Sequence, residues 1–377
     1  MAGAVILVMS LTGVVLAFER QAIAFAERDL RARETQAQPL SPSKIVAAAS
    51  AAAPGTPASS LVVRRDRLAP AAVAFGRERT LFVDRYSGAV LGEGARGLRR
   101  FFHVNEDLHR ALALKAAGKK VTGAANLLFL FIVLSGLYLW IPRRRGRGSL
   151  RKVTLFRGGL RGRARDFNWH NVLGFWSFLP LVAIVFSGVV ISYPWAGALV
   201  YRALGSEPPR PQGNEREGAR RNQGGRESRE RRDDASRLDR LWSSALTNAV
   251  GRTPEWQSIS VRMPFPEKGP VTFAIDEGNG ARPDKRSQLV LDPRSGRLVE
   301  HKTYAAQSAG QKARGWLRWI HTGEAGGLPG QIVAALASAA AVVLVWTGIA
   351  LALRRLRRWR GAPESVISQQ QLEEVEA

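Results

Sequence analysis

Three histidines of the chain stand at regular distances from glycines that lie in apolar segments. The matched pairs, separated by 27, 27 and 18 residues, are His109 with Gly136, His321 with Gly348, and His170 with Gly188. A neutral imidazole is a common metal ligand, and histidine can hold a b-type haem without any cysteine. The spacing therefore favours His109, His170 and His321 as axial ligands of haem iron.

Each of these glycines follows a hydroxyl residue, and the pair recurs in a fourth apolar segment. The four pairs are Thr12-Gly13, Ser135-Gly136, Ser187-Gly188 and Thr347-Gly348. Because glycine lets a ligand approach the backbone closely, Gly136, Gly188 and Gly348 are predicted to lie against the cofactor. The same repeat predicts a histidine eighteen residues before Gly13, which is upstream of Met1.

A simpler interpretation places these histidines in the aromatic belt of a membrane surface. Trp169 and Trp319 lie close to two of them and fit that alternative. It explains a single histidine well, whereas three matched spacings favour haem. His103 is a weaker alternative to His109 because it lacks the matched spacing, and His301 is expected to be a surface or packing residue.

The elements that must position these residues are four long apolar segments, at residues 1–18, 124–141, 172–199 and 328–353. A membrane-spanning helix needs about 20 mainly apolar residues. None of the four segments contains Asp, Glu, Lys, Arg or His, which disfavours the interpretation that they are buried helices of a soluble bundle. The first segment lacks the basic start and small-residue cleavage site of a signal peptide, so it is predicted to be a span.

Charge predicts the orientation of these spans. The formal net charge is +25, from 56 Lys and Arg against 31 Asp and Glu. Ten basic residues lie in the loop 142–171, and five arginines begin the tail 354–377. Short basic segments beside a span stay cytoplasmic, so both termini are expected to be cytoplasmic and the loops 19–123 and 200–327 to face outward. This topology explains the basic excess and makes a nucleic-acid partner unnecessary.

The two outward loops share a hairpin signal. An Asp-x-x-Ser-Gly turn lies between apolar strands in each, beginning at Asp84 in the first and at Asp292 in the second. The aspartate side chain accepts hydrogen bonds from the backbone of the turn, and glycine adopts the positive φ that the turn requires. Each loop is therefore predicted to form a small α+β lobe. The stretch 207–239 is rich in Arg, Glu, Gly, Gln and Asn and is predicted to be disordered.

These features resemble the PepSY-associated transmembrane helix family, which includes iron-regulated membrane proteins and inner-membrane ferric-siderophore reductases. The segments that carry the resemblance surround His109, Ser135-Gly136, His170 and His321, with the two Asp-x-x-Ser-Gly hairpins resembling PepSY lobes. The resemblance implies a bacterial inner-membrane protein with four helices in the lipid bilayer and two PepSY-like periplasmic lobes.

The resemblance also implies one or two haems of type b. His109 and His321 would ligate a haem on the periplasmic side, and His170 a haem on the cytoplasmic side. The implied activity is electron transfer to the iron of a ferric siderophore. No G-x-G-x-x-G fingerprint follows a strand, so the donor is expected to be a quinol or a flavoprotein. The alternatives are a non-redox membrane protein that regulates a periplasmic peptidase, and a permease for iron chelates.

Overall fold

The structure is a computed structural model, and it describes residues 2–33, 35–140, 151, 153–209, 227–266, 269–280 and 282–360. The chain divides into two compact units. The helical unit comprises Met1–Val14, His109–Phe186 and Val333–Ala377, and the sheet unit comprises Val15–Leu108 and Ser187–Ile332. Each unit is described separately below.

Four helices are long and apolar enough to cross a membrane, over Ala2–Ala26, Lys115–Trp140, Gly162–Ser192 and Glu324–Arg357. They agree in number and order with the predicted spans. The corresponding helices are α1 (Ala2–Leu16) continued by α2 (Glu19–Ala26), α5 (Lys115–Trp140), α7 (Gly162–Ser192) and α11 (Gly327–Arg360). At 1.5 Å of rise per residue, a 26-residue helix is about 39 Å long, which exceeds the hydrocarbon core of a bilayer.

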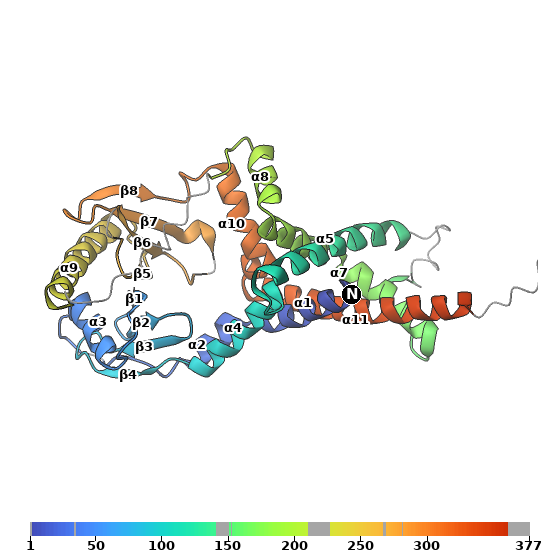
Figure 1. Ribbon diagram of the computed structural model, residues 1–377, viewed down its shortest axis with the longest axis horizontal. Helices are drawn as coiled ribbons and strands as arrows, with labels where there is room; N and C mark the ends of the chain where they lie inside the picture. The colour runs from blue at the N-terminus through green and yellow to red at the C-terminus, as the bar shows by residue number, and fades with distance from the viewer. Residues whose placement is uncertain are drawn as a thin grey trace, which may run out of the picture. The chain divides into compact units, whose positions relative to one another are not determined.

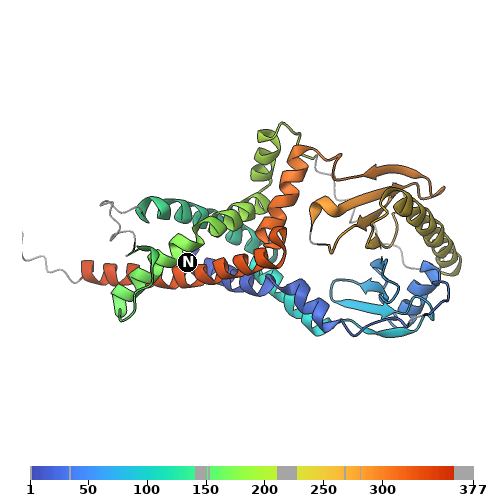
Figure 2. The same cartoon turned by 180° about the vertical axis from the view of Figure 1, so that it is seen from behind.

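The helical unit is drawn as helical ribbons in Figures 1 and 2. Apolar side chains and a buried polar contact hold its helices together. Leu181 of α7 and Ala337 and Ala341 of α11 form a buried cluster. Small residues on α11 allow the helices to approach closely, as is usual inside membranes. The Asn126 side chain of α5 donates a hydrogen bond of 3.0 Å to the carbonyl of Val185 on α7.

The sheet unit contains one eight-stranded antiparallel sheet in the order β4-β3-β2-β1-β5-β6-β7-β8. Its strands are β1 (Ser60–Arg64), β2 (Ala71–Phe75), β3 (Arg79–Val83), β4 (Val90–Glu93), β5 (Ser258–Arg262), β6 (Val271–Asp276), β7 (Arg286–Leu291) and β8 (Leu298–Lys302). The strands β1–β4 and β5–β8 form two consecutive meanders, and β1 pairs with β5 about the central Val62–Ser260 pair.

This arrangement differs from the expectation of a separate lobe in each loop. Each loop does supply four strands and a covering helix, but the strands meet in one sheet. The two predicted turns are present. The Asp84 carboxylate accepts hydrogen bonds from the backbone of Tyr86 and Ser87, and Asp292 accepts them from Arg294 and Ser295. Positive φ angles of 77° at Gly88 and 71° at Gly296 complete the turns.

The core of the sheet unit lies beneath α3 (Pro42–Ala51) and α9 (Glu227–Arg252). Leu241, Ala245 and Ala249 of α9 are fully buried, which places one face of the helix on the sheet. The helix begins at Glu227 and so includes 227–239 of the stretch predicted to be disordered. Arg and Glu are good helix formers, and the buried face that starts at Leu238 anchors them. Residues 210–226 of that prediction lie outside the described residues.

The remaining helices lie outside the long apolar helices and the two helices that cover the sheet. They are α4 (Arg96–Ala111), α8 (Pro194–Ala203) and α10 (Ala309–His321), with 3-10 helices η2 (Pro283–Lys285) and η3 (Glu324–Gly326). Helix α10 begins with a capping box in which Ser308 and Gln311 satisfy each other's backbone N–H groups. Helices α4 and α10 matter most for the site, because one carries His109 and the other ends at His321.

Candidate functional site

His109 lies in the last turn of α4 and is hydrogen-bonded to the first span. Its Nδ1 is 3.0 Å from the hydroxyl oxygen of Thr12. The Thr12 hydroxyl also lies 2.7 Å from the carbonyl oxygen of Val8, to which it donates. A Cβ placed on Gly13 would stand 3.5 Å from Cε1 of the His109 ring. Thr12 therefore contacts the imidazole through Nδ1, and Gly13 leaves the space of a side chain open beside the neighbouring Cε1.

His170 makes the same arrangement with the fourth span. It lies in the third turn of α7, and its Nδ1 is 2.9 Å from the hydroxyl oxygen of Thr347. The Thr347 hydroxyl lies 2.8 Å from the carbonyl oxygen of Val343. A Cβ on Gly348 would stand 3.5 Å from Cε1 of His170. The geometry repeats that of His109 almost atom for atom.

His321, at the end of α10, completes the set. Its Nδ1 is 3.3 Å from the hydroxyl oxygen of Ser187 on α7, whose side chain is fully buried. We call these contacts the three hydroxyl–imidazole pairs: Thr12–His109, Ser187–His321 and Thr347–His170. The structure thus gives all three predicted histidines the same kind of partner.

The sequence argument missed which helix supplies each partner. Spacing linked His109 to Gly136 on the helix that follows it, yet the observed partner is Thr12 of the preceding span. Within the described residues, the Ser135 hydroxyl donates to the carbonyl of Ile132, and open space lies where a Cβ on Gly136 would stand. The recurring Ser/Thr-Gly pair was the sequence signal for these partners. Antiparallel neighbouring spans place the end of one span beside the start of the other, so a histidine can meet a pair on the neighbouring span.

Tight turns carry His109 and His321 into the spans that follow them. A Cβ on Gly118 of α5 would overlap the carbonyl oxygen of Ala111, two residues after His109. A Cβ on Gly330 of α11 would overlap the carbonyl oxygen of Gly323, two residues after His321. Each glycine stands nine residues after its histidine. The two turns therefore pack in the same way, with a helix glycine against a backbone carbonyl.

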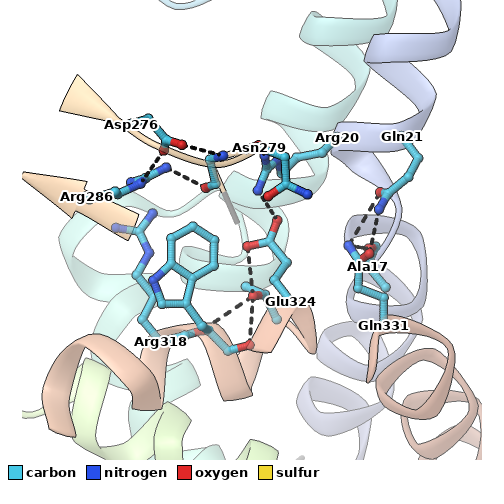
Figure 3. A network of polar contacts seen from close by, with 12 residues as sticks. Ala17, Arg20, Gln21, Asp276, Asn279, Arg286, Arg318, Glu324 and Gln331 are labelled. Atoms are coloured by element: carbon cyan, nitrogen blue, oxygen red, sulfur yellow. Dashed lines mark hydrogen bonds and ion pairs between the residues drawn. The ribbon is translucent and has the colours of Figure 1, made fainter. Parts of the chain in front are cut away.

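Polar contacts within the sheet unit secure the residues around His321 (Figure 3). Arg20 of α2 forms a 3.1 Å ion pair with Glu324, three residues beyond the histidine. Arg286 of β7 lies over the ring of Trp319, 5.1 Å from its centroid, and is itself paired with Asp276. The cation–π contact and ion pairs tie the β6–β7 hairpin to the end of α10.

Gln331 provides a further buried attachment near the same turn. Its side-chain amide donates a 2.8 Å hydrogen bond to the carbonyl of Ala17 and also contacts Gln21 (Figure 3). An unpaired amide would be costly in this position because Gln331 is buried. These bonds attach the start of α11 to the residues that join α1 and α2.

An ion pair in the helical unit holds the same two helices as the His170 contact. Asp166, one helical turn before His170, is buried and lies 2.8 Å from Arg354 of α11. Arg165 also contacts its carboxylate, at 3.0 Å. The Asp166–Arg354 pair therefore supports the register in which His170 meets Thr347.

The other two histidines have different surroundings. His103 of α4 has its Nε2 2.9 Å from Arg77, and its Nδ1 is 3.8 Å from both Glu78 and Asp107. His301 of β8 has a pKa below its usual value because of burial and the nearby Arg252 guanidinium. None of the contacts described for these two histidines involves a Ser/Thr-Gly pair. This distinguishes them from the three predicted ligands.

Two chemical limits bear on what these histidines could hold. In the parts of the chain that the structure describes, no three His, Asp or Glu side chains cluster closely enough to bind a metal ion, and the chain has no cysteine. A metal that depends on three or more protein ligands does not fit these residues. A macrocycle that brings its own four nitrogen ligands needs only one or two histidines.

The family profile described as the PepSY-associated TM region matches residues 1–355. The chain belongs to this family. The match covers the first three long apolar helices in full and the fourth as far as residue 355. The protein is accordingly a multi-pass membrane protein. No curated protein matches the chain at a significant level.

Proposed function

We propose that this PepSY-associated TM protein binds haem b and transfers electrons within the membrane. The observation that carries the proposal is the set of three hydroxyl–imidazole pairs. In metalloproteins, a ligating histidine almost always uses its second ring nitrogen for a hydrogen bond that orients the ring. Here Nδ1 makes that bond in each case, and Nε2 is the nitrogen that would bind iron.

The glycines provide a second argument for a large planar group. A methyl group at Gly13 or Gly348 would reach the imidazole edge only at an ordinary contact distance of 3.5 Å. The imidazole alone therefore does not require glycine at these positions. A haem lying beside the ring would need the additional room, since glycine permits close approach to the backbone.

The proposed ligand assignment follows the resemblance. His109 and His321 would each serve as a haem ligand on the periplasmic side, and His170 as a haem ligand on the cytoplasmic side. Gly188 and Gly348 would border the macrocycles, and Gly136 provides open space on α5 for the same purpose. The basic segments around α7 and at the end of α11 support an inner-membrane location with both termini cytoplasmic.

The proposed substrate is Fe(III) held by a siderophore on the periplasmic side. Bound haem supplies one-electron redox chemistry, while the protein fixes its ligands and surrounds it with a low-dielectric interior. A siderophore binds iron through hard oxygen donors, which hold Fe(II) less tightly than Fe(III). Electrons would come from a quinol or a flavoprotein.

A visible spectrum of the full-length protein, purified from haem-replete cells, tests cofactor binding. We expect a Soret band and, after dithionite, sharp α and β bands. His109→Ala, His170→Ala and His321→Ala should each reduce the haem content, whereas His301→Ala is the matched control and should retain it. A colourless wild-type protein, or unchanged spectra in all three ligand variants, would contradict the proposal.

Electron transfer to iron is tested separately. The dithionite-reduced protein, freed of excess reductant, is mixed with a ferric hydroxamate under anaerobic conditions, and the α band is followed with a ferrous-specific chromophore present. We expect the α band to decay as ferrous iron appears. Haem that stays reduced would exclude the reductase activity and favour a binding or regulatory role.

A further inference from the structure

Thr12 and Thr347 use their hydroxyl groups in the same way, although they lie on different spans. Each hydroxyl oxygen is within 3.0 Å of a histidine Nδ1 and within 2.8 Å of the backbone carbonyl four residues earlier. A second carbonyl, three residues earlier, lies at 3.1 Å from Thr12 and at 3.3 Å from Thr347. Both side chains are buried, so water does not compete for these bonds.

The direction of each bond follows from counting protons. A threonine hydroxyl has one proton to donate and two lone pairs that accept. A backbone carbonyl can only accept, so the hydroxyl proton points to Val8 in one case and to Val343 in the other. The oxygen must then accept from the imidazole, and the proton of a neutral His109 or His170 resides on Nδ1. The lone pair of each ring is therefore on Nε2.

We propose that Thr12 and Thr347 are positioning residues that fix the tautomer and orientation of His109 and His170 for binding iron through Nε2. This inference rests on the proposed function, which it extends from the ligands to the groups that prepare them. Ser187 occupies the corresponding place at His321, with a contact of 3.3 Å.

The hydroxyl is expected to affect the bound iron in two ways. A hydrogen bond from Nδ1–H to the threonine oxygen makes Nε2 a stronger electron donor to iron. This stabilises ferric haem and lowers its midpoint potential. It also holds the ring in place before haem arrives, so that less rotational freedom is lost on binding. Loss of a partner of this kind typically weakens metal binding about 10- to 100-fold.

Matched variants separate this role from simple packing. Thr12→Val and Thr347→Val keep the shape of the side chain and remove the hydroxyl, whereas Thr12→Ser and Thr347→Ser retain it. Two measurements are made on full-length protein: the tautomer of each histidine by ¹⁵N NMR on the haem-free form, and the haem midpoint potential by redox titration. Thr347→Ala gives a second hydroxyl-free variant in case valine impairs folding.

We expect the hydroxyl-free variants to show a mixture of tautomers, a raised midpoint potential and faster haem loss, and the serine variants to match the wild type. Hydroxyl-free variants with an unchanged tautomer and unchanged potential would overturn the inference. The NMR measurement needs no haem. A haem-free wild type would thus refute the proposed function, while the tautomer result would still decide whether the threonines fix the rings.

Discussion

Replacing Gly118 or Gly330 with alanine should destabilise the protein, because each added methyl group would overlap a backbone oxygen. The oxygens belong to Ala111 and Gly323, which close the turns after His109 and His321. A flexible side chain could move aside cheaply, but a carbonyl oxygen in a tight turn moves only if the backbone of the turn shifts.

The size of the effect follows from two opposing terms. Alanine in a helix gains about 1 kcal/mol over glycine in intrinsic propensity. Forcing an extra carbon into a filled space costs about 1–3 kcal/mol, and we take about 3 kcal/mol because the obstacle is backbone. The net loss is about 2 kcal/mol. With about 2 °C of melting temperature per kcal/mol for a chain of this size, each variant should melt about 4 °C lower.

The assay is thermal denaturation of the full-length protein in detergent, with all variants heated at one scan rate because unfolding of membrane proteins is often irreversible. The matched control is Gly251→Ala in α9, where nothing lies within 4 Å of the added methyl. That variant should melt at or slightly above the wild-type temperature. If Gly118→Ala and Gly330→Ala melt like the control, the two turns are not packed as described.

Three further predictions concern charged groups, each checked by melting temperature. Asp166→Asn should destabilise the protein by about 2 kcal/mol, below the range for fully buried pairs because its partners Arg354 and Arg165 are half-exposed. Hydrogen bonds from the backbone N–H of Ser295, and then from its hydroxyl, lower the pKa of Asp292 below its ordinary 3.8. The stability that this carboxylate contributes above pH 3.8 should therefore be lost as the pH falls through the folded-state pKa. The loss of stability should be smaller in Asp292→Asn. Burial lowers the pKa of His301. The unfolded chain therefore takes up a proton first, stability should decline as pH falls below about 6.5, and His301→Gln should flatten that decline.

The four spans and both aspartate turns could be predicted because their causes are local. An apolar segment without charge reveals a membrane helix by composition, and an Asp-x-x-Ser-Gly sequence contains the acceptor and the positive-φ residue of its own turn. The single sheet could not be predicted in this way. It depends on pairing Leu61 with Val261, and nothing in either short strand specifies a partner so distant in the chain.

The extent of α9 was missed for a related reason. Before Leu238 the helix has Ala235 as its one apolar residue, and composition alone suggested disorder. The helix is anchored further along, where Leu241, Trp242 and Ala245 are buried against the sheet. Tertiary burial at one end of a segment can therefore order good helix formers at the other end, which average composition cannot detect.

The spacing singled out three histidines as candidate ligands, but it did not identify their hydroxyl partners, because spacing along one helix does not give the register between two. The structure adds an argument that spacing could not provide. His170 is inside a continuous helix, whereas His321 ends a separate helix before a turn. Two different backbone routes thus bring an imidazole to the same kind of Ser/Thr-Gly pair. A histidine that only lines a membrane surface needs no buried hydroxyl at Nδ1. The recurrence of that hydroxyl is best explained if the opposite nitrogen, Nε2, has a ligand to bind.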